Sequence, residues 1–435
     1  MFKTRTVNIL ALALCFAIGT LSGCTKKAEP FWSEKEVALL RSISLSSLST
    51  PPDAPSNRIA DDPRAVALGQ ALFFDQRLSR SEKISCATCH QPELQFSDGL
   101  EKGQGINRLG RNTPGIIGGA WQSWFYWDGR RDSLWAQALI PIEAPDEMGG
   151  SRTGAVRLIM NDQDYRKRYT SLFGPLPPSL QLSDLPEHAG EFTNLEGKDS
   201  WYRMPKSTQD AVNRSYANIG KTIAAFERTL TPKANSFDRY VESLTRDGEQ
   251  IASSLLGQSA LRGAKLFIDL ETTRCLQCHN GPLLTNGDFH NIGTATALGF
   301  VAANTPRETS TQPLDFGRLL GVQAVLLDQF NCLGKYSDAK SNQCSALRFL
   351  SSQQHGDIAG AFKTPSLRNV AQTAPYFHHG LTTSIKGVLQ HYNSVPDDNN
   401  NELTPMNLGE QQLDDIVAFL NTLNSPAYAK FPRSK

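Results

Sequence analysis

Two copies of the pattern C-x-x-C-H constrain this chain of 435 residues more than any other feature of its sequence. They are Cys86-Ala-Thr-Cys89-His90 and Cys275-Leu-Gln-Cys278-His279. A C-x-x-C pair alone also fits a redox dithiol or half of a zinc site, but a histidine directly after the second cysteine is the attachment signature of c-type haem. In such a site two thiols bond the macrocycle and the histidine binds the iron. The sequence therefore predicts two covalently bound haems, with His90 and His279 as proximal iron ligands.

The residues ahead of the two motifs are similar as well. Ala67-Leu-Gly-Gln-Ala-Leu-Phe73 precedes the first motif and Leu261-Arg-Gly-Ala-Lys-Leu-Phe267 precedes the second, which indicates a duplicated unit of a helix followed by a haem site. Residues 211–230 and 413–423 have the apolar spacing of further helices. Alternation with a period of two is scarce, and loops with Gly and Pro are long. We expect a mostly α fold of two cytochrome c-like haem domains with long irregular loops.

The chain starts with the features of an export signal. Lys3 and Arg5 precede an apolar run, 7–18, that is too short to span a bilayer comfortably. The run leads to small residues before Cys24, which is typical of a lipoprotein signal, in which the chain is cut ahead of Cys24 and its thiol is lipidated. An ordinary secretory signal is the alternative. Both export the protein, and we expect a periplasmic location with a lipid anchor in the outer membrane.

The remaining cysteines and the charge balance narrow the range of functions. Cys332 and Cys344 lie outside the two motifs, and an oxidising compartment favours a disulfide between them. Lys plus Arg number 44 and Asp plus Glu number 43, without a long run of either sign. Nothing in the sequence therefore indicates binding to nucleic acid or to a charged membrane surface, and membrane contact is expected only through the lipid anchor.

Beyond the haem motifs, the chain resembles the di-haem cytochrome c peroxidase family, including its MauG-like branch. The resemblance extends over about residues 61–423. It is carried, in family order, by Phe96-Ser-Asp-Gly99, Arg111-Asn-Thr-Pro114, Trp127-Asp-Gly-Arg130, Gln137-Ala138, Asp146-Glu-Met-Gly149, Gly281-Pro-Leu-Leu284, Phe362-Lys-Thr-Pro-Ser-Leu-Arg-Asn369 and Ala374-Pro-Tyr-Phe-His378. It implies that peroxide reacts at the amino-terminal haem and that the carboxy-terminal haem passes electrons to it.

We accordingly expect four parts along the chain. Residues 1–23 are the signal peptide, and residues 24–60 hold the lipid anchor, a short helix and a linker rich in Ser and Pro. Residues 61–245 are the amino-terminal peroxidatic haem domain, and residues 246–435 are the carboxy-terminal electron-transfer haem domain.

Three residues match catalytic positions of the family. Trp127, Gln137 and Glu147 stand ten residues apart, as the family's inter-haem tryptophan, distal glutamine and distal glutamate do. Breaking the O–O bond of peroxide needs a group that takes a proton from the inner oxygen and returns it to the outer one, and a carboxylate above an open iron can do so. The resemblance implies that Glu147 is this group, that Gln137 hydrogen-bonds in the pocket and that Trp127 relays electrons. A solvated loop glutamate and an aromatic core residue are the alternatives.

The sixth iron ligands differ from those of many family members. A histidine occupies this role on the resting first haem of those members, but the matching position here is Gln104, so we expect that haem to be five-coordinate or water-bound. On the second haem, family peroxidases place a methionine fourteen residues after the position of His378, where this chain has Tyr392, as in the MauG-like branch. A phenolate stabilises oxidised iron, whereas methionine favours the reduced state. His391 as the ligand, or a plain core tyrosine, are the alternatives.

The resemblance also implies a calcium ion between the domains. Asn112, Thr373 and Pro375 match the positions that bind it through oxygen atoms, which suit this hard cation. Ordinary turn and loop residues are the alternative. The other histidines are expected at the surface or around the haem ligands; they are His188, His290, His355 and His379.

The leading interpretation is a peroxidase that reduces hydrogen peroxide to water with electrons from a small soluble cytochrome c or cupredoxin. The alternative is a MauG-like oxidase, in which a high-valent iron state oxidises aromatic side chains of a partner protein. A third interpretation, an electron-transfer cytochrome without chemistry of its own, is disfavoured by Glu147 beside an open iron. The family resemblance is also compatible with a homodimer.

Overall fold

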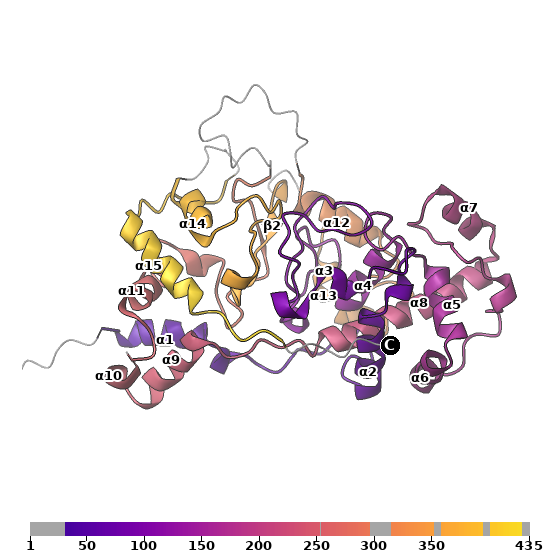
Figure 1. The fold of residues 1–435 in the computed structure, drawn as a ribbon, viewed down its shortest axis with the longest axis horizontal. Helices are drawn as coiled ribbons and strands as arrows, with labels where there is room; N and C mark the ends of the chain where they lie inside the picture. The colour runs from indigo at the N-terminus through magenta and orange to yellow at the C-terminus, as the bar shows by residue number, and fades with distance from the viewer. Residues whose placement is uncertain (1–30, 253, 296–314, 352–357, 395–400, 429–435) are drawn as a thin grey trace, which may run out of the picture.

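The structure, a computed structural model, describes residues 31–252, 254–295, 315–351, 358–394 and 401–428 (Figure 1). Its helices are α1 (Glu34–Ser42), α2 (Pro63–Phe73), α3 (Cys86–Cys89), α4 (Leu134–Glu143), α5 (Arg152–Asn161), α6 (Gln163–Phe173), α7 (Leu195–Arg203), α8 (Lys206–Glu227), α9 (Ser236–Arg246), α10 (Glu249–Ala252), α11 (Gln258–Phe267), α12 (Arg318–Leu327), α13 (Ser345–Arg348), α14 (Ile385–Ser394) and α15 (Glu410–Asn421). Two short strands, β1 (Phe289–His290) and β2 (Phe362–Lys363), pair antiparallel. The expected class, mostly α with long irregular connections, is confirmed.

The described residues bury two apolar clusters, one in each half of the chain. The first cluster is built mainly from residues 59–230 and the second mainly from residues 237–423. Figure 1 shows the same division, with α11 and α15 towards one end of the molecule and α5 to α8 towards the other. The change between clusters thus falls between Leu230 and Phe237, ahead of the expected boundary at 245.

Two segments pack against the half of the molecule that is distant from them in sequence. Leu40 of α1 is buried in the second cluster, and Trp32 donates a hydrogen bond to the Tyr240 hydroxyl of α9 at 2.6 Å. The short helix after the expected anchor is therefore part of the carboxy-terminal half rather than of a separate linker. Conversely, Phe330, which precedes the disulfide between Cys332 and Cys344, is buried in the first cluster.

The duplicated unit brings two helices together in the same way in each half. α2 crosses α8 so closely that a Cβ on Gly69 would lie 1.8 Å from the Thr222 carbonyl oxygen. α11 crosses α15 equally closely, since a Cβ on Gly263 would lie 1.8 Å from the Asp415 carbonyl oxygen. Only glycine allows backbones to approach this closely. Each crossing is completed by a pair of phenylalanines, Phe73 with Phe226 at 5.2 Å and Phe267 with Phe419 at 5.1 Å.

A second duplication, not predicted from the sequence, covers the segments where the halves meet. Thr113-Pro114 corresponds to Thr364-Pro365, Trp127 to His378, and α4 to α14, all at the same spacing along the chain. The contacts are reciprocal. The Asn112 N–H donates to the His378 carbonyl at 2.8 Å, and the Lys363 N–H donates to the Trp127 carbonyl at 2.7 Å.

The expected signal peptide and Cys24 lie outside the described residues. Among the residues that the structure describes, no helix is both long and apolar enough to cross a membrane.

Candidate functional site

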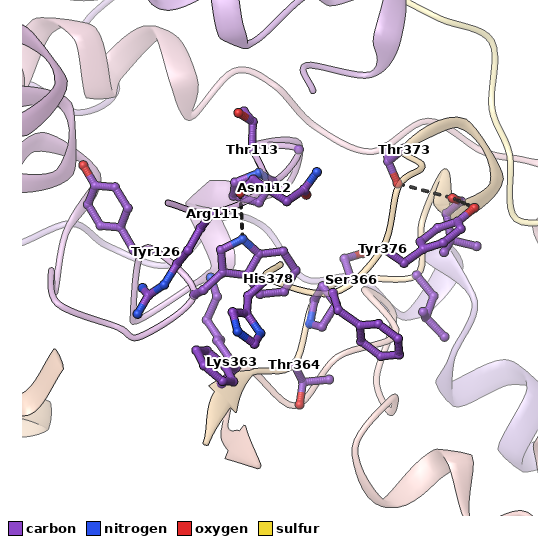
Figure 2. A pocket seen from close by; sticks show the side chains of 18 of the residues that line it. Arg111, Asn112, Thr113, Tyr126, Lys363, Thr364, Ser366, Thr373, Tyr376 and His378 are labelled. Carbon is purple, nitrogen blue, oxygen red and sulfur yellow. Dashed lines mark hydrogen bonds between the residues drawn. The ribbon is translucent and has the colours of Figure 1, made fainter. Parts of the chain in front are cut away.

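A cavity of about 830 Å³ lies between the two halves and reaches both C-x-x-C-H motifs. Its lining includes both histidines of the motifs, His90 and His279. Figure 2 shows its central part, where Arg111, Asn112 and Tyr126 of one half face Lys363 and His378 of the other. The four motif cysteines form no disulfide, so their thiols are free to bond a macrocycle.

The two motif histidines are oriented by equivalent hydrogen bonds. Nδ1 of His90 lies 2.9 Å from the Phe96 carbonyl oxygen, and Nδ1 of His279 lies 3.0 Å from that of Leu284. Because a carbonyl only accepts, each Nδ1 carries the proton and each Nε2 keeps its lone pair for a metal. Burial lowers the pKa of both rings, that of His279 to about 4, which keeps them neutral. Both are therefore preset as iron ligands.

Glu147 lies on the turn between α4 and α5 and faces the cavity on the amino-terminal side. Burial raises the pKa of its carboxyl, the nearby Arg130 guanidinium opposes this effect, and the Asp146 charge adds to it. A carboxyl with a raised pKa exchanges a proton more readily near neutral pH, which is what an acid–base group needs.

The wall around Glu147 is built from α4 and the segment before it. Gln137 of α4 lines the cavity, and its carbonyl accepts a hydrogen bond from the Tyr126 hydroxyl at 3.4 Å. Arg130 stacks on the Tyr126 ring with its guanidinium 3.4 Å from the ring centre, which places a fixed positive charge at this wall. Trp127, Gln137 and Glu147 thus line one cavity, although they come from a loop, a helix and a turn.

The loop with Gln104 supports Glu147 without entering the cavity. The Gln104 side chain is exposed and does not line the cavity. Next to it, the Ile106 N–H donates to the Glu147 carbonyl at 2.8 Å, and Gly105 packs so tightly that a Cβ would lie 2.5 Å from the same oxygen. This loop therefore fixes the turn that carries Glu147.

Comparison with known proteins agrees with this geometry. The family model of di-haem cytochrome c peroxidase matches residues 63–246. The methylamine utilization protein MauG of Methylorubrum extorquens is 32% identical over 97% of this chain and 96% of its own. This chain belongs to the di-haem peroxidase and MauG family. Cytochrome c551 peroxidase of Nitrosomonas europaea is 26% identical over 97% of this chain and 91% of its own. Membership means that the chain carries two covalently bound c-type haems.

Solved structures show the same fold. The diheme peroxidase BthA from Burkholderia thailandensis has a TM-score of 0.59 at 21% identity, over 83% of this chain and 86% of its own. A MauG-like protein associated with microbial copper homeostasis has a TM-score of 0.58 at 21% identity, over 87% of this chain and 93% of its own.

The cavity also fits the charge of two haems, whose propionates are anionic. Lys363 is half-buried in its wall and donates to the Gln122 side chain and to the Trp124 carbonyl. Among the described residues no carboxylate forms a salt bridge with it; desolvation lowers its pKa to about 8, and the Asp128 charge only partly opposes this. A partly desolvated cation without a direct anionic partner is stabilised when a ligand supplies the opposite charge. Lys363 is therefore suited to hold a haem carboxylate.

Trp127 is placed between the halves, as an inter-haem residue requires. Its indole N–H donates to the Asn112 carbonyl at 2.9 Å, and its own carbonyl accepts from Lys363 of the other half. Figure 2 shows this region with Asn112 directly beside His378. The sequence indicated Trp127 by its motif alone. The structure adds that Trp127 forms hydrogen bonds with residues of both halves.

Tyr392 and its neighbour His391 lie differently with respect to the second haem site. Tyr392 of α14 lines the cavity, and burial raises its pKa. His391 does not line it and is bound through Nε2 to the Ile292 carbonyl at 2.6 Å. This geometry favours Tyr392 over His391 as the sixth ligand. Met406 and His290 also line the cavity, and sequence reasoning did not weigh Met406 as a ligand.

Pro141 is the site residue that sequence reasoning missed. It lies inside α4 and lines the cavity. In the second duplication α4 corresponds to α14, and Pro141 takes the place of Tyr392. The proline side chain has no atom that can bind iron, whereas the same helical position in α14 carries a phenol that could serve as a ligand. The constant spacing of the duplicated motifs was the signal that could have revealed it.

The residues expected to bind calcium belong to the wall of the same cavity. Asn112, Thr373 and Pro375 all line it. The Asn112 amide donates to the Leu100 carbonyl at 2.8 Å, which leaves its side-chain oxygen as an acceptor. No group of three or more His, Cys, Asp or Glu in the described chain could hold a metal, so calcium here would depend on neutral oxygens. The calcium site stays a prediction.

The other histidines have varied surroundings. His188 is half-buried, and His379 is buried rather than at the surface. His290 pairs with Glu402 at 2.7 Å beside the second haem site. His355 lies outside the described residues.

Proposed function

We propose that this protein reduces hydrogen peroxide to water at the haem bound by His90, with electrons delivered through the second haem. The observation that carries the proposal is the half-buried Glu147 carboxyl in the cavity wall, whose pKa is raised by desolvation, on the side where Pro141 offers no iron ligand. A pure electron carrier has no use for an open iron beside an acid–base group.

The bound haems supply an iron that binds peroxide and a second redox centre, and the surrounding residues manage protons and charge. Glu147 takes the proton from the inner peroxide oxygen and returns it to the outer oxygen, which leaves as water. The complete reaction consumes one peroxide, two electrons and two protons and gives two waters. Arg130 holds positive charge near Glu147, and Gln137 offers a hydrogen bond to a bound oxygen.

The electron path follows from the place of Trp127. Its indole N–H donates to the Asn112 carbonyl of its own half, and its backbone carbonyl accepts from the Lys363 N–H of the other half. A small soluble cytochrome c or cupredoxin, docking on the carboxy-terminal half, is the donor that we propose.

The proposal is tested with Glu147→Gln. This variant keeps the shape of the side chain and removes its acid–base function, so the bimolecular rate with peroxide in stopped-flow should fall about a hundredfold or more. Both haem spectra should stay unchanged. Asp146→Asn is the matched control, because it removes the neighbouring charge and leaves the Glu147 carboxyl in place. An unchanged rate in Glu147→Gln would remove Glu147 from the mechanism.

A second candidate function is an oxidase of aromatic side chains on a partner protein. Tyr392 favours it, because an anionic oxygen ligand stabilises an oxidised second haem, which then stores oxidising equivalents for a slow protein substrate. The 32% identity with MauG of Methylorubrum extorquens also supports it.

Peroxide titration of the fully oxidised protein separates the two functions. If Tyr392 is the ligand, one equivalent of peroxide should change the spectra of both haems, and Tyr392→Phe should confine the change to the first. Rapid turnover with reduced cytochrome c supports the peroxidase, and a persistent oxidised state without turnover supports the oxidase. Electron paramagnetic resonance that shows methionine or bis-histidine ligation would refute the role of Tyr392.

We further propose that the protein is exported and lipid-anchored through Cys24 in the outer membrane. The sequence 1–24 supports this proposal. Labelling of the cells with a tagged fatty acid, compared with Cys24→Ser, tests it: no label in the unchanged protein would exclude the anchor.

A further inference from the structure

The loops that orient the two proximal histidines are both strained. Phe96 and Leu284, whose carbonyls accept from His90 and His279, have φ angles of 59° and 54°. Gln95, directly before Phe96, is also left-handed with φ of 56°. Residues other than glycine adopt this conformation at an energetic cost, and it persists only where surrounding contacts hold it. Each loop therefore needs a support.

The loop of the carboxy-terminal half is supported from within its own half. The Ser366 hydroxyl donates to the Leu283 carbonyl at 2.6 Å, and Nε of Arg368 donates to the Pro282 carbonyl at 2.8 Å. Both donors belong to the segment that follows β2. The backbone that presents the Leu284 carbonyl is thus fixed by two side chains nearby in the same half.

The amino-terminal half lacks both of these supports. In the second duplication, Ser366 corresponds to Gly115 and Arg368 to Ile117, and neither has a side-chain donor. The backbone arrangement is otherwise retained, since a Cβ on Gly115 would lie 3.2 Å from the Gln95 carbonyl oxygen. Hydrogen bonds within the loop remain, such as that from the Phe96 N–H to the Gln91 carbonyl at 2.8 Å, but the missing side-chain support has to come from another segment.

That support comes from the other half of the molecule. The Gln95 side chain is 1% exposed, and its amide donates to the Gln372 side-chain oxygen at 2.6 Å and to the Ser425 carbonyl at 3.1 Å. Ser425 is itself fixed, because its N–H and hydroxyl both donate to the Asn369 side-chain oxygen at 2.8 and 2.9 Å. The ring of Phe96 packs on Tyr428 at 5.3 Å.

We propose that Gln95 is a positioning residue through which the carboxy-terminal half sets the hydrogen bond from His90 to the Phe96 carbonyl. This bond makes the imidazole a stronger donor to iron, as partners of metal-bound histidines generally do. Loosening the contacts of Gln95 with Gln372 and Ser425 lets the loop relax and weakens the bond. The first haem then gains a less basic ligand and a higher reduction potential.

The experiment uses the holoprotein and three variants. Gln95→Leu removes the donor but keeps the bulk, Gln372→Ala removes the acceptor on an exposed side chain of the other half, and Ser366→Gly copies Gly115 in the carboxy-terminal loop. The iron–histidine stretching frequency of the reduced His90 haem, by resonance Raman, should fall in the first two variants. Its potential should rise in both. Ser366→Gly should change only the potential of the His279 haem.

A fall in thermal stability alone would not produce this pattern. Gln372→Ala decides the outcome even if Gln95→Leu folds poorly, because Gln372 is exposed. An unchanged His90 haem in Gln372→Ala, or equal shifts at both haems, would overturn the proposal. Neither measurement involves turnover, so the result does not depend on which substrate the protein uses.

Discussion

In the amino-terminal half α2 crosses α8 at Gly69, and in the carboxy-terminal half α11 crosses α15 at Gly263. Each half then directs a histidine Nδ1 at a left-handed carbonyl, Phe96 in one and Leu284 in the other. The attachment side of the two haem sites is therefore nearly the same. Attachment depends on short-range geometry, which a duplicated sequence preserves.

The opposite sides of the two sites differ at corresponding positions. Pro141 stands where the second half has Tyr392. Glu227, five residues after the α2–α8 contact at Thr222, stands where α15 has Leu420, and both line the cavity. The comparison indicates that both halves retain the same backbone arrangement. The different roles proposed for the two haems then depend on a few side chains in the cavity wall. Substitutions at the helix crossings, at Pro141 and at Glu227 test this comparison.

The largest effect is expected at the helix crossings. Gly69→Ala places a Cβ 1.8 Å from the Thr222 carbonyl oxygen, and Gly263→Ala does the same at Asp415, so one backbone must move. Each variant should lose about 3 kcal/mol of unfolding free energy or more, the upper range for overpacking. Denaturant unfolding measures this. Gly110→Ala is the control, because its Cβ would meet nothing within 4 Å. Losses no larger than in the control would mean that the crossings tolerate side chains.

The next effect tests whether Pro141 keeps the first haem open. Pro141→Tyr gives α4 the phenol that α14 carries, so the rate with peroxide should fall about a hundredfold or more, as for loss of the acid–base group. A phenolate signature should appear at the first haem in resonance Raman. Pro141→Phe controls for bulk. Equal inhibition by both aromatic residues without that signature would show that size, not ligation, closes the site.

The last effect appears only as a pH dependence and concerns the buried acid of α8. Burial raises the pKa of Glu227 to about 8, and its Oε2 has no hydrogen-bond partner in the structure. The folded state therefore binds this proton more tightly than the unfolded state. The contribution of Glu227 to the free energy of unfolding is fully present below about pH 4.5. It falls by at most about 1.4 kcal/mol per pH unit up to about pH 8 and stays constant above that pH.

Glu227→Gln should remove this pH dependence. Its melting temperature should match that of the unchanged protein near pH 5 and exceed it by several degrees above pH 8. Glu93→Gln, on an exposed side chain, serves as control. The melting temperatures of the unchanged protein and of Glu227→Gln are plotted against pH. If the two curves run parallel from pH 5 to 9, another group must neutralise Glu227 in the holoprotein.

Several features could be predicted because they depend on residues close together in sequence. The haem motifs, the helices before them and the candidate pair Cys332 and Cys344 were all read from local spacing. The structure joins that pair with Cα atoms 5.8 Å apart. The positions of Glu147 and Tyr392 came from family resemblance, and the cavity lining now agrees with them. Their chemical roles stay predictions.

Other features depend on contacts between distant segments. Packing of α1 on α9 joins residues about 200 positions apart, as the bond from Trp32 to Tyr240 shows with a separation of 208. Pro141 gained meaning only when α4 and α14 were seen to correspond. Local patterns carry no information about which half will bury a given apolar face.

The sequence by itself determined that this chain carries two c-type haems and predicted His90 and His279 as their iron ligands, because thioether attachment and axial ligation are encoded in five adjacent residues. Only the tertiary structure decided what holds each histidine in place. Gln95 bonds to Ser425 across 330 positions, whereas Ser366 supports its own half. The reason is physical: a strained loop is stabilised by whichever side chains the folded chain brings within hydrogen-bond distance.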